Sequence, residues 1–202
     1  MSRDTLTPHR QYVAHGANYE TGVTVFQIFL AQGLKSTDKV CDVGCGSLRV
    51  GRYLITHLEH GNYYAIEPNQ WLVNAAIEHE IGTLLEVKRA QIAWRDDFNI
   101  YLTYPSVSFD WVLISSVLAH ASHEQLKAAL TNALKVSNKV LFDTIPISGA
   151  GPDNTGGWQY PQVANHSDEC VQEAIAGTGA RLTKLELGPF GEQWWRLDYD
   201  GD

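Results

Sequence analysis

The sequence contains few cysteines and no motif that would join them to a metal. Its 202 residues include three cysteines, and an odd number fits a reducing compartment better than the disulfide framework of a secreted protein. No C-x-x-C spacing occurs, and no group of His, Asp or Glu residues has evident metal-ligand spacing. The sequence therefore predicts no metal site, although Asp143 leaves a metal-assisted variant open.

Positive charge is scarce, and long apolar runs are absent. The chain has 15 Lys and Arg against 23 Asp and Glu, a net charge of −8. Its basic residues cluster only in the short pair Lys88–Arg89, so nucleic acid is not expected as a partner. The first residues are polar, and the apolar run at 23–30 is too short to cross a bilayer. We therefore expect a cytoplasmic protein without a membrane partner.

Repeats, low-complexity tracts and dividing linkers are also missing. With 44% hydrophobic and 19% charged residues, the chain is long enough to bury a full core without disulfides. These features predict a single domain over residues 1–202. No heptad pattern or large apolar helix face stands out, so nothing indicates an oligomeric state.

The most informative stretch that is present covers residues 39–52, K-V-C-D-V-G-C-G-S-L-R-V-G-R. Its first part, Lys39–Val43, predicts a buried strand, and Arg49–His57 predicts the helix that follows. Gly44 and Gly46 lie where the backbone must turn sharply and approach a ligand without a Cβ in the way. Taken alone, such a turn is as typical of an ordinary connection between a strand and a helix as it is of a ligand-binding loop.

An acidic residue at the end of the next strand favours the ligand-binding interpretation. The apolar and aromatic stretch 62–66 predicts a strand, and Glu67 follows it at once. An acid about 20 residues beyond a glycine-rich loop can accept hydrogen bonds from both ribose hydroxyls of a nucleoside. The loop and Glu67 together predict a nucleoside site.

The loop distinguishes two families that bind nucleosides. A dinucleotide site has the pattern G-x-G-x-x-G, and Arg49 stands here at the position of the last glycine. Asp42 would repel a pyrophosphate, whereas it suits a cationic amino-acid group. The stretch D-V-G-C-G-S-L-R resembles motif I of the class I S-adenosylmethionine-dependent methyltransferases, D/E-x-G-x-G-x-G, with Leu48 at the third glycine. The resemblance covers roughly residues 35–200.

The order of elements is also similar to that of this family. The patterns predict helices at 22–32, 71–80, 124–135 and 167–178, and further strands at 84–92, 109–114, 139–144, 181–187 and 193–199. The resemblance implies an α/β, Rossmann-like methyltransferase fold. Such a fold has a mostly parallel seven-stranded sheet with one antiparallel strand near the C-terminus and helices on both faces.

The resemblance further implies S-adenosyl-L-methionine as the cofactor. The cofactor-binding residues that it indicates are Asp42, Gly44, Cys45, Gly46, Glu67, Pro68, Asp97, Phe98 and Ser115. Asp97, with Asp96 as the alternative, would bond the adenine amino group, and Phe98 would pack on the ring. If the acceptor loses a proton, His120 just past the fourth strand is the candidate general base. Alternatively, His120 caps the next helix or bonds a carbonyl, and the same holds for His123.

Two segments outside the common frame are candidates for contact with a substrate. Residues 1–35 predict a helical lid, and the substrate-side loop 145–166 combines glycines with Trp158, Tyr160 and His166. A loop of this length is usually functional, but an ordinary surface excursion is the alternative. The six Trp and nine Tyr suit a small-molecule pocket, although those in strands are expected in the core: Tyr64, Trp111 and Trp194 or Trp195.

Three functions of different class remain. The favoured hypothesis is transfer of a methyl group from S-adenosylmethionine to a small-molecule acceptor, with an oxygen atom as the nucleophile. The second is a catalytically inactive subunit that binds the cofactor. The third is a nicotinamide-dependent oxidoreductase, which the imperfect loop and the final pair of strands disfavour.

Overall fold

The computed structural model describes residues 19–146, 156–160, 162–188 and 190–200, with side chains from residue 21 onward. The chain forms two compact units, residues 1–96 and residues 97–202. The prediction of a single domain is not tested by this division. Most of the predicted N-terminal lid, residues 1–18, lies outside the described residues.

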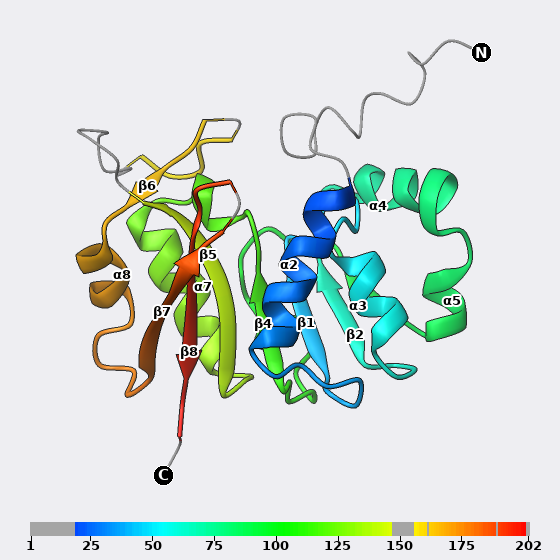
Figure 1. Ribbon diagram of the computed structural model, residues 1–202, viewed down its shortest axis with the longest axis horizontal. Helices are drawn as coiled ribbons and strands as arrows, with labels where there is room; N and C mark the ends of the chain where they lie inside the picture. Colours follow the sequence, from blue (N-terminus) through cyan, green and yellow to red (C-terminus); the bar gives the residue numbers. More distant parts are fainter. Residues whose placement is uncertain (1–18, 147–155, 161, 189, 201–202) are drawn as a thin grey trace. The chain divides into compact units, whose positions relative to one another are not determined.

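The first unit contains three parallel strands in the order β3-β2-β1; β1 and β2 are labelled in Figure 1. They are β1 (Val40–Val43), β2 (Tyr63–Ile66) and β3 (Gln91–Ala93). All residues of β1 and β2 are buried, as expected for parallel strands that are covered on both faces. The helical segments of this unit are α2 (Tyr19–Ala31), α3 (Gly51–His57), α4 (Gln70–Ala76), the π-helical turn Ile77–Ile81 and α5 (Leu84–Lys88).

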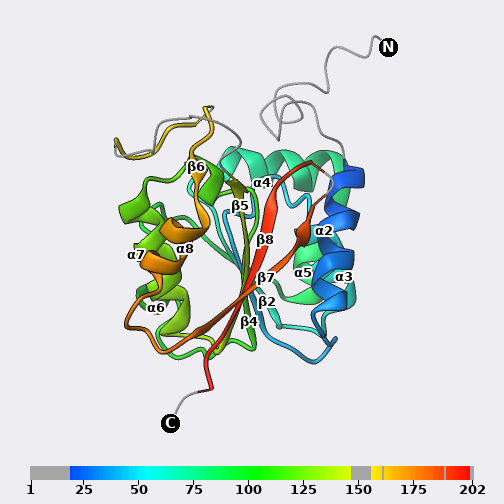
Figure 2. The same cartoon turned by 60° about the vertical axis from the view of Figure 1, so that its left-hand side comes forward.

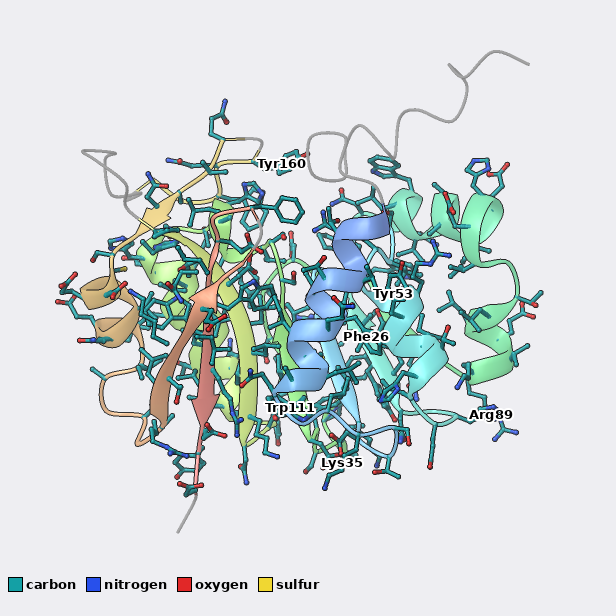
Figure 3. The ribbon with its side chains drawn as sticks, in the orientation of Figure 1. Phe26, Lys35, Tyr53, Arg89, Trp111 and Tyr160 are labelled. Atoms are coloured by element: carbon teal, nitrogen blue, oxygen red, sulfur yellow. The ribbon has the colours of Figure 1, made fainter. Side chains whose placement is uncertain are left out.

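Helices α2 and α3 lie side by side through aromatic contacts. The ring of Phe26 stacks on that of Tyr53 with centroids 5.9 Å apart (Figure 3) and meets His57 edge-on at 5.4 Å. Gly22 permits the close approach, because a Cβ at this position would lie 2.1 Å from the carbonyl oxygen of Arg49. The residues just after the glycine-rich loop are therefore held in place by α2.

The predicted strand at 84–92 is wrong over its first half. Residues Leu84–Lys88 form α5, and only Gln91–Ala93 pair with β2. Lys88 donates its Nζ to the carbonyl oxygen of Leu58 at the end of α3, and Arg89 ends α5 in the left-handed conformation at φ 53°. A short apolar run fits either periodicity, and here the contact with α3 decides for the helix.

The second unit contains a strand layer in the order β4-β5-β8-β7. Its strands are β4 (Trp111–Ile114), β5 (Lys139–Pro146), β8 (Gln193–Asp198) and β7 (Arg181–Leu187), with β6 (Asn165–His166) paired to the end of β5. β4 and β5 are parallel, whereas β8 is antiparallel to both of its neighbours. The helical segments are α6 (Ile100–Thr103), the 3-10 turn Leu118–His120, α7 (His123–Leu134) and α8 (Asp168–Ala174).

Helices α7 and α8 lie side by side in this unit (Figure 2). Each begins at a serine cap: Ser122 forms a capping box with Gln125, and the Ser167 hydroxyl accepts from the Cys170 amide at 3.1 Å. The predicted start of this helix at Ser167 is confirmed, since Ser167 is its cap, but α8 ends at Ala174, four residues before the predicted end at Thr178. The two caps fix where α7 and α8 begin.

Large aromatic side chains fill the core of the second unit. Trp111 is fully buried, with Lys139 Nζ 5.0 Å and Arg196 Cζ 5.4 Å from its ring centroid. Trp194 and Trp195 are buried as well, and the Trp195 indole donates to Thr144 Oγ1 at 2.9 Å. Core positions for Tyr64, Trp111, Trp194 and Trp195 are therefore confirmed.

The predicted fold class is confirmed: the chain is α/β, its strands are mostly parallel, and an antiparallel strand lies near the C-terminus. The sequence did not reveal α6, β6 or the extension of β5 to Pro146. None of the helices in the described part of the chain is both long and apolar enough to span a membrane.

Candidate functional site

The glycine-rich loop follows β1 and is tied to the end of β2. The amides of Gly44 and Cys45 donate to the carbonyl oxygen of Ile66 at 2.7 and 3.3 Å. Gly44 and Gly46 both have positive φ, 75° and 54°, a conformation that glycine adopts at no steric cost. A Cβ at Gly46 would meet nothing within 4 Å, so the space beside this backbone is open to a ligand.

Glu67 lies against this loop, as predicted. It is buried, and its Oε2 accepts from the Gly46 amide at 3.0 Å. Its Oε1 accepts from the amide and the side chain of Asn69 at 2.8 and 2.9 Å. Each carboxylate oxygen has further acceptor capacity, so the same group can also accept hydrogen bonds from ribose hydroxyls. Pro68, the next predicted residue, is exposed beside it.

Asp42 is a buried acid inside β1. Burial raises the pKa of its carboxyl to about 7; the hydrogen bond from Tyr63 and the charge of Arg49 lower this pKa, and the charge of Glu67 raises it. The Tyr63 hydroxyl donates to Asp42 Oδ2 at 2.8 Å. A cation placed near Asp42 would favour its ionised form. Sequence reasoning missed Tyr63 because its partnership with Asp42 arises only when β1 pairs with β2.

The cysteines of this region do not have the properties of nucleophiles. Cys41 and Cys45 are buried, and burial raises the pKa of each thiol well above its ordinary value. A neutral buried thiol is unreactive. Cys45 therefore contributes backbone and volume to the loop.

Three predicted residues of the second unit occupy the ends of its elements. Asp97 is exposed, and its Oδ1 accepts from the Asn99 amide at 3.1 Å. Phe98 has a φ of 53°, which is strained for an aromatic residue. Ser115 follows β4 and is buried; within the part of the chain that the structure describes, its Oγ makes no hydrogen bond. A buried hydroxyl of this kind is suited to a ligand.

Asp143 has a structural partner at the same end of β4. Its carboxylate is buried, and Oδ1 accepts from the Ser116 amide at 2.6 Å. Ser116 has a φ of 58°, so this hydrogen bond holds the backbone in the turn that follows Ser115. The role of Asp143 was missed because it depends on the pairing of β4 with β5.

His120 lies at the end of the 3-10 turn with two aromatic neighbours. Its Nδ1 is 2.8 Å from the carbonyl oxygen of Gln162, and its ring meets those of Trp158 and Tyr160 at 5.5 and 4.9 Å. Tyr160 is labelled in Figure 3. A carbonyl only accepts, so Nδ1 carries the proton in the neutral ring and Nε2 is the basic nitrogen. The alternative that His120 bonds a carbonyl is therefore confirmed.

Comparison with known proteins identifies the family. The family described as Methyltransferase domain matches residues 41–139, which include the glycine-rich loop, Glu67 and His120. The chain belongs to the class I S-adenosylmethionine-dependent methyltransferases. No curated protein matched the chain by sequence.

Several solved structures share the fold of this methyltransferase at low identity. Magnesium protoporphyrin IX methyltransferase (ChlM) from Synechocystis PCC 6803 with bound SAM has a TM-score of 0.66 at 14% identity, over 90% of this chain and 79% of that one. DesVI from Streptomyces venezuelae has 0.67 at 14%, over 93% and 94%. A DhpI-SAM-HEP complex has 0.66 at 14%, over 94% and 91%. The cofactor of the family is S-adenosylmethionine, which excludes the nicotinamide alternative.

The departure of this methyltransferase from motif I has a structural explanation. Leu48 stands at the third glycine position and has a φ of 57°, so the backbone keeps the left-handed conformation that a glycine would adopt there. The Leu48 side chain is fully buried. Burial of a leucine contributes roughly 1.5–3 kcal/mol, which offsets a left-handed cost of about 1–2 kcal/mol.

We expect Leu48→Gly to be no less stable than Leu48→Ala, and both to be roughly 2–5 kcal/mol less stable than wild type because the buried side chain is lost. Glycine is normally about 1 kcal/mol worse than alanine within an element, but at positive φ the alanine carries the steric cost. Urea unfolding of both variants and the wild type measures their free energies of unfolding. A glycine variant that is less stable than the alanine variant by the usual amount would refute this account of Leu48.

We expect Asp42→Asn to gain stability relative to wild type as the pH rises from 5 to 7.5. An unfolded Asp ionises near pH 4, whereas Asp42 in the folded chain holds its proton to about pH 7. The contribution of this raised pKa to stability is complete below about pH 4 and is lost as pH rises through 7, at roughly 1.4 kcal/mol per unit at most. Thermal unfolding across this range, with exposed Asp200→Asn as control, tests it. A constant difference between variant and wild type would contradict the raised pKa.

Proposed function

We propose that this methyltransferase transfers a methyl group from S-adenosylmethionine to a hydroxyl of a small-molecule acceptor, with His120 as the general base. The observation that carries the proposal is the contact between His120 Nδ1 and the Gln162 carbonyl oxygen at 2.8 Å. This contact makes Nε2 the proton acceptor, and a hydroxyl is an acceptor that loses a proton on methylation.

We propose cofactor-binding residues in each unit, taken separately. In the first unit, Gly44, Cys45 and Gly46 supply an open backbone edge, Glu67 with the adjacent Pro68 lies beside it, and Asp42 supplies an anionic charge for the amino-acid group. In the second unit, we assign adenine recognition to Asp97 and Phe98 and a polar contact to the buried Ser115 hydroxyl. S-adenosylmethionine supplies a sulfonium methyl group that is already activated for displacement.

The acceptor is proposed to be a small molecule because of the groups around His120. Trp158 is 49% exposed and lies edge-on to the His120 ring, and Tyr160 lies at 4.9 Å from it. Exposed aromatic faces beside a base suit a compact, partly apolar ligand. The net charge of −8 disfavours a polyanionic acceptor. One structural neighbour, ChlM, is described as acting on magnesium protoporphyrin IX.

His120 would take the proton that the acceptor hydroxyl loses as its oxygen bonds to the methyl carbon. The Gln162 carbonyl would stabilise the protonated ring by keeping its contact with Nδ1–H. Most of the acceleration is then expected from positioning, because in-line displacement needs the nucleophile about 3 Å from the methyl carbon.

We expect Gly46→Val and Glu67→Ala each to weaken binding of S-adenosylhomocysteine by about 100-fold or more. The valine would fill the approach to the loop, and loss of the carboxylate removes charged hydrogen bonds of roughly 1.5–3 kcal/mol each. Calorimetric titration with NAD as the negative control measures this. Gly61→Val is the matched control, since Gly61 also has positive φ and open space around it. Wild-type affinity in both site variants would overturn the cofactor assignment.

We expect His120→Gln to lower kcat by about 10²- to 10⁴-fold with little change in cofactor affinity. The wild type, assayed for methyl transfer with a panel of hydroxyl and amine acceptors, should lose activity as the pH falls through the range where histidine protonates, and the variant should not show this limb. Exposed His60→Gln is the control.

If His120→Gln keeps the full rate and pH profile, His120 is not the base. If the wild type binds the cofactor but methylates no acceptor, the inactive-subunit alternative is favoured.

A further inference from the structure

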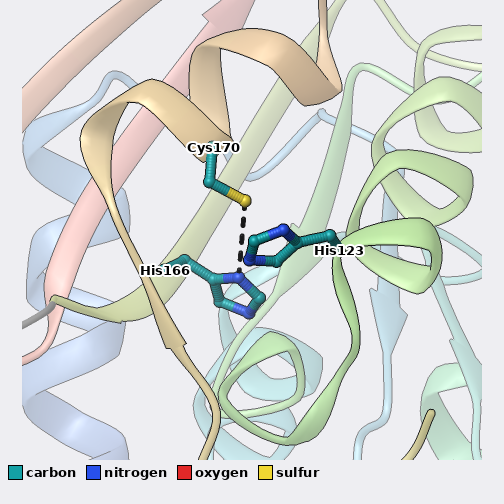
Figure 4. Close-up of side chains that lie close together, drawn as sticks. All are labelled: His123, His166 and Cys170. Atoms are coloured by element: carbon teal, nitrogen blue, oxygen red, sulfur yellow. Dashed lines mark hydrogen bonds between the residues drawn. The ribbon is translucent and has the colours of Figure 1, made fainter. Parts of the chain in front are cut away.

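Three side chains that the methyl transfer does not use converge in the second unit. His123 begins α7, His166 lies on β6, and Cys170 lies on α8. One ligand atom from each residue lies within 4.8 Å of the other two. Figure 4 shows both imidazole rings and the thiol directed toward a common point. His166 and Cys170 are buried, at 1% and 8% exposure.

The orientation of His166 is that of a metal ligand. Its Nε2 is 3.0 Å from the carbonyl oxygen of Leu118. Because a carbonyl can only accept, Nε2 carries the proton and the lone pair is on Nδ1. That Nδ1 is 3.8 Å from Cys170 Sγ. Histidines that bind metals commonly donate their other N–H to a backbone carbonyl, which fixes both the tautomer and the ring.

The set of donor atoms selects the kind of ion. Two imidazoles and a thiolate are ligands of Zn²⁺, with bonds of about 2.0–2.1 Å to nitrogen and 2.3 Å to sulfur. Tetrahedral bonds of these lengths place nitrogen and sulfur roughly 3.5 Å apart. The observed 3.8 Å between His166 Nδ1 and Cys170 Sγ is close to this spacing. We propose that His123, His166 and Cys170 bind one zinc ion, with a fourth position left for water.

Local structure fixes the positions of the three proposed ligands before an ion binds. The capping box at Ser122 fixes the first residue of α7, which is His123. The pairing of β6 with β5 places His166 opposite Pro146. The Ser167 cap then starts α8 and fixes the position of Cys170 in its first turn. A site assembled by caps and strand pairing loses little conformational entropy when it binds an ion.

The zinc ion would hold the substrate-side segment against the 3-10 turn that carries His120. The two are already joined: the Ala164 amide donates to the Ala119 carbonyl at 2.6 Å, and the Gln159 amide donates to that of His120 at 2.9 Å. His166 contacts Leu118 in the same turn. The ion would therefore stabilise the segment with Trp158 and Tyr160. Its binding does not depend on the proposed methyl acceptor.

The test uses the full chain after removal of metal by a chelator. Zinc titration with a chromophoric competitor should give one ion per chain with a dissociation constant below micromolar, and excess zinc should raise the unfolding temperature by roughly 5–10 °C. Cobalt(II) in place of zinc should produce a thiolate-to-cobalt charge-transfer band with tetrahedral visible bands. The band is read on the wild type, so it does not depend on whether a variant folds.

Variants locate the site. Cys170→Ala should remove the cobalt-thiolate band, and His166→Gln or His123→Gln should weaken zinc binding by about 10-fold or more. Two controls should leave the cobalt-thiolate band and the zinc affinity unchanged: Cys41→Ala, which changes another buried cysteine, and His60→Gln, which changes an exposed histidine. Absence of the band in the wild type, or an unchanged band in Cys170→Ala, would overturn the proposal. Cofactor binding measured on the same samples distinguishes this failure from failure of the methyltransferase site.

Discussion

The hydrogen bond from the Gly46 amide to the Glu67 carboxylate, 3.0 Å long, is the constraint on which the first unit of this methyltransferase depends. It joins the loop after β1 to the end of β2, and the amides of Gly44 and Cys45 reinforce the same connection through Ile66. A buried carboxylate must have its oxygens satisfied. Glu67 meets this need with the loop and Asn69, and so it is held in position before a cofactor arrives.

The buried acids of the two units are stabilised in different ways. Asp42 has a hydroxyl donor, and burial keeps its pKa near 7, so its charge is sensitive to what binds nearby. Asp143 accepts from a backbone amide and holds the turn after β4. The first arrangement responds to a cationic ligand, whereas the second maintains the backbone next to Ser115.

Backbone carbonyls set the chemistry of two histidines in the second unit. Gln162 accepts from Nδ1 of His120, and Leu118 accepts from Nε2 of His166. In each ring the other nitrogen becomes the basic one. We propose that this nitrogen takes the proton at His120 and binds the metal at His166. The end of the predicted substrate-side loop 145–166 forms the short strand β6, and its His166 is buried.

The sequence by itself determined where β1 and β2 end, and with them the glycine-rich loop and Glu67, because burial of apolar runs and the need for positive φ depend on residue type at each position. It also determined the start of α8 at Ser167, because an N-cap is a local hydrogen bond. The helix at 84–88, the partnership of Tyr63 with Asp42 and the tautomers of His120 and His166 were decided only by tertiary structure. Each depends on which strand or helix lies opposite, and such contacts join residues that are far apart in the chain. The convergence of His123 with His166 and Cys170 has the same origin, since strand pairing and helix packing bring together ligands that no short spacing connects.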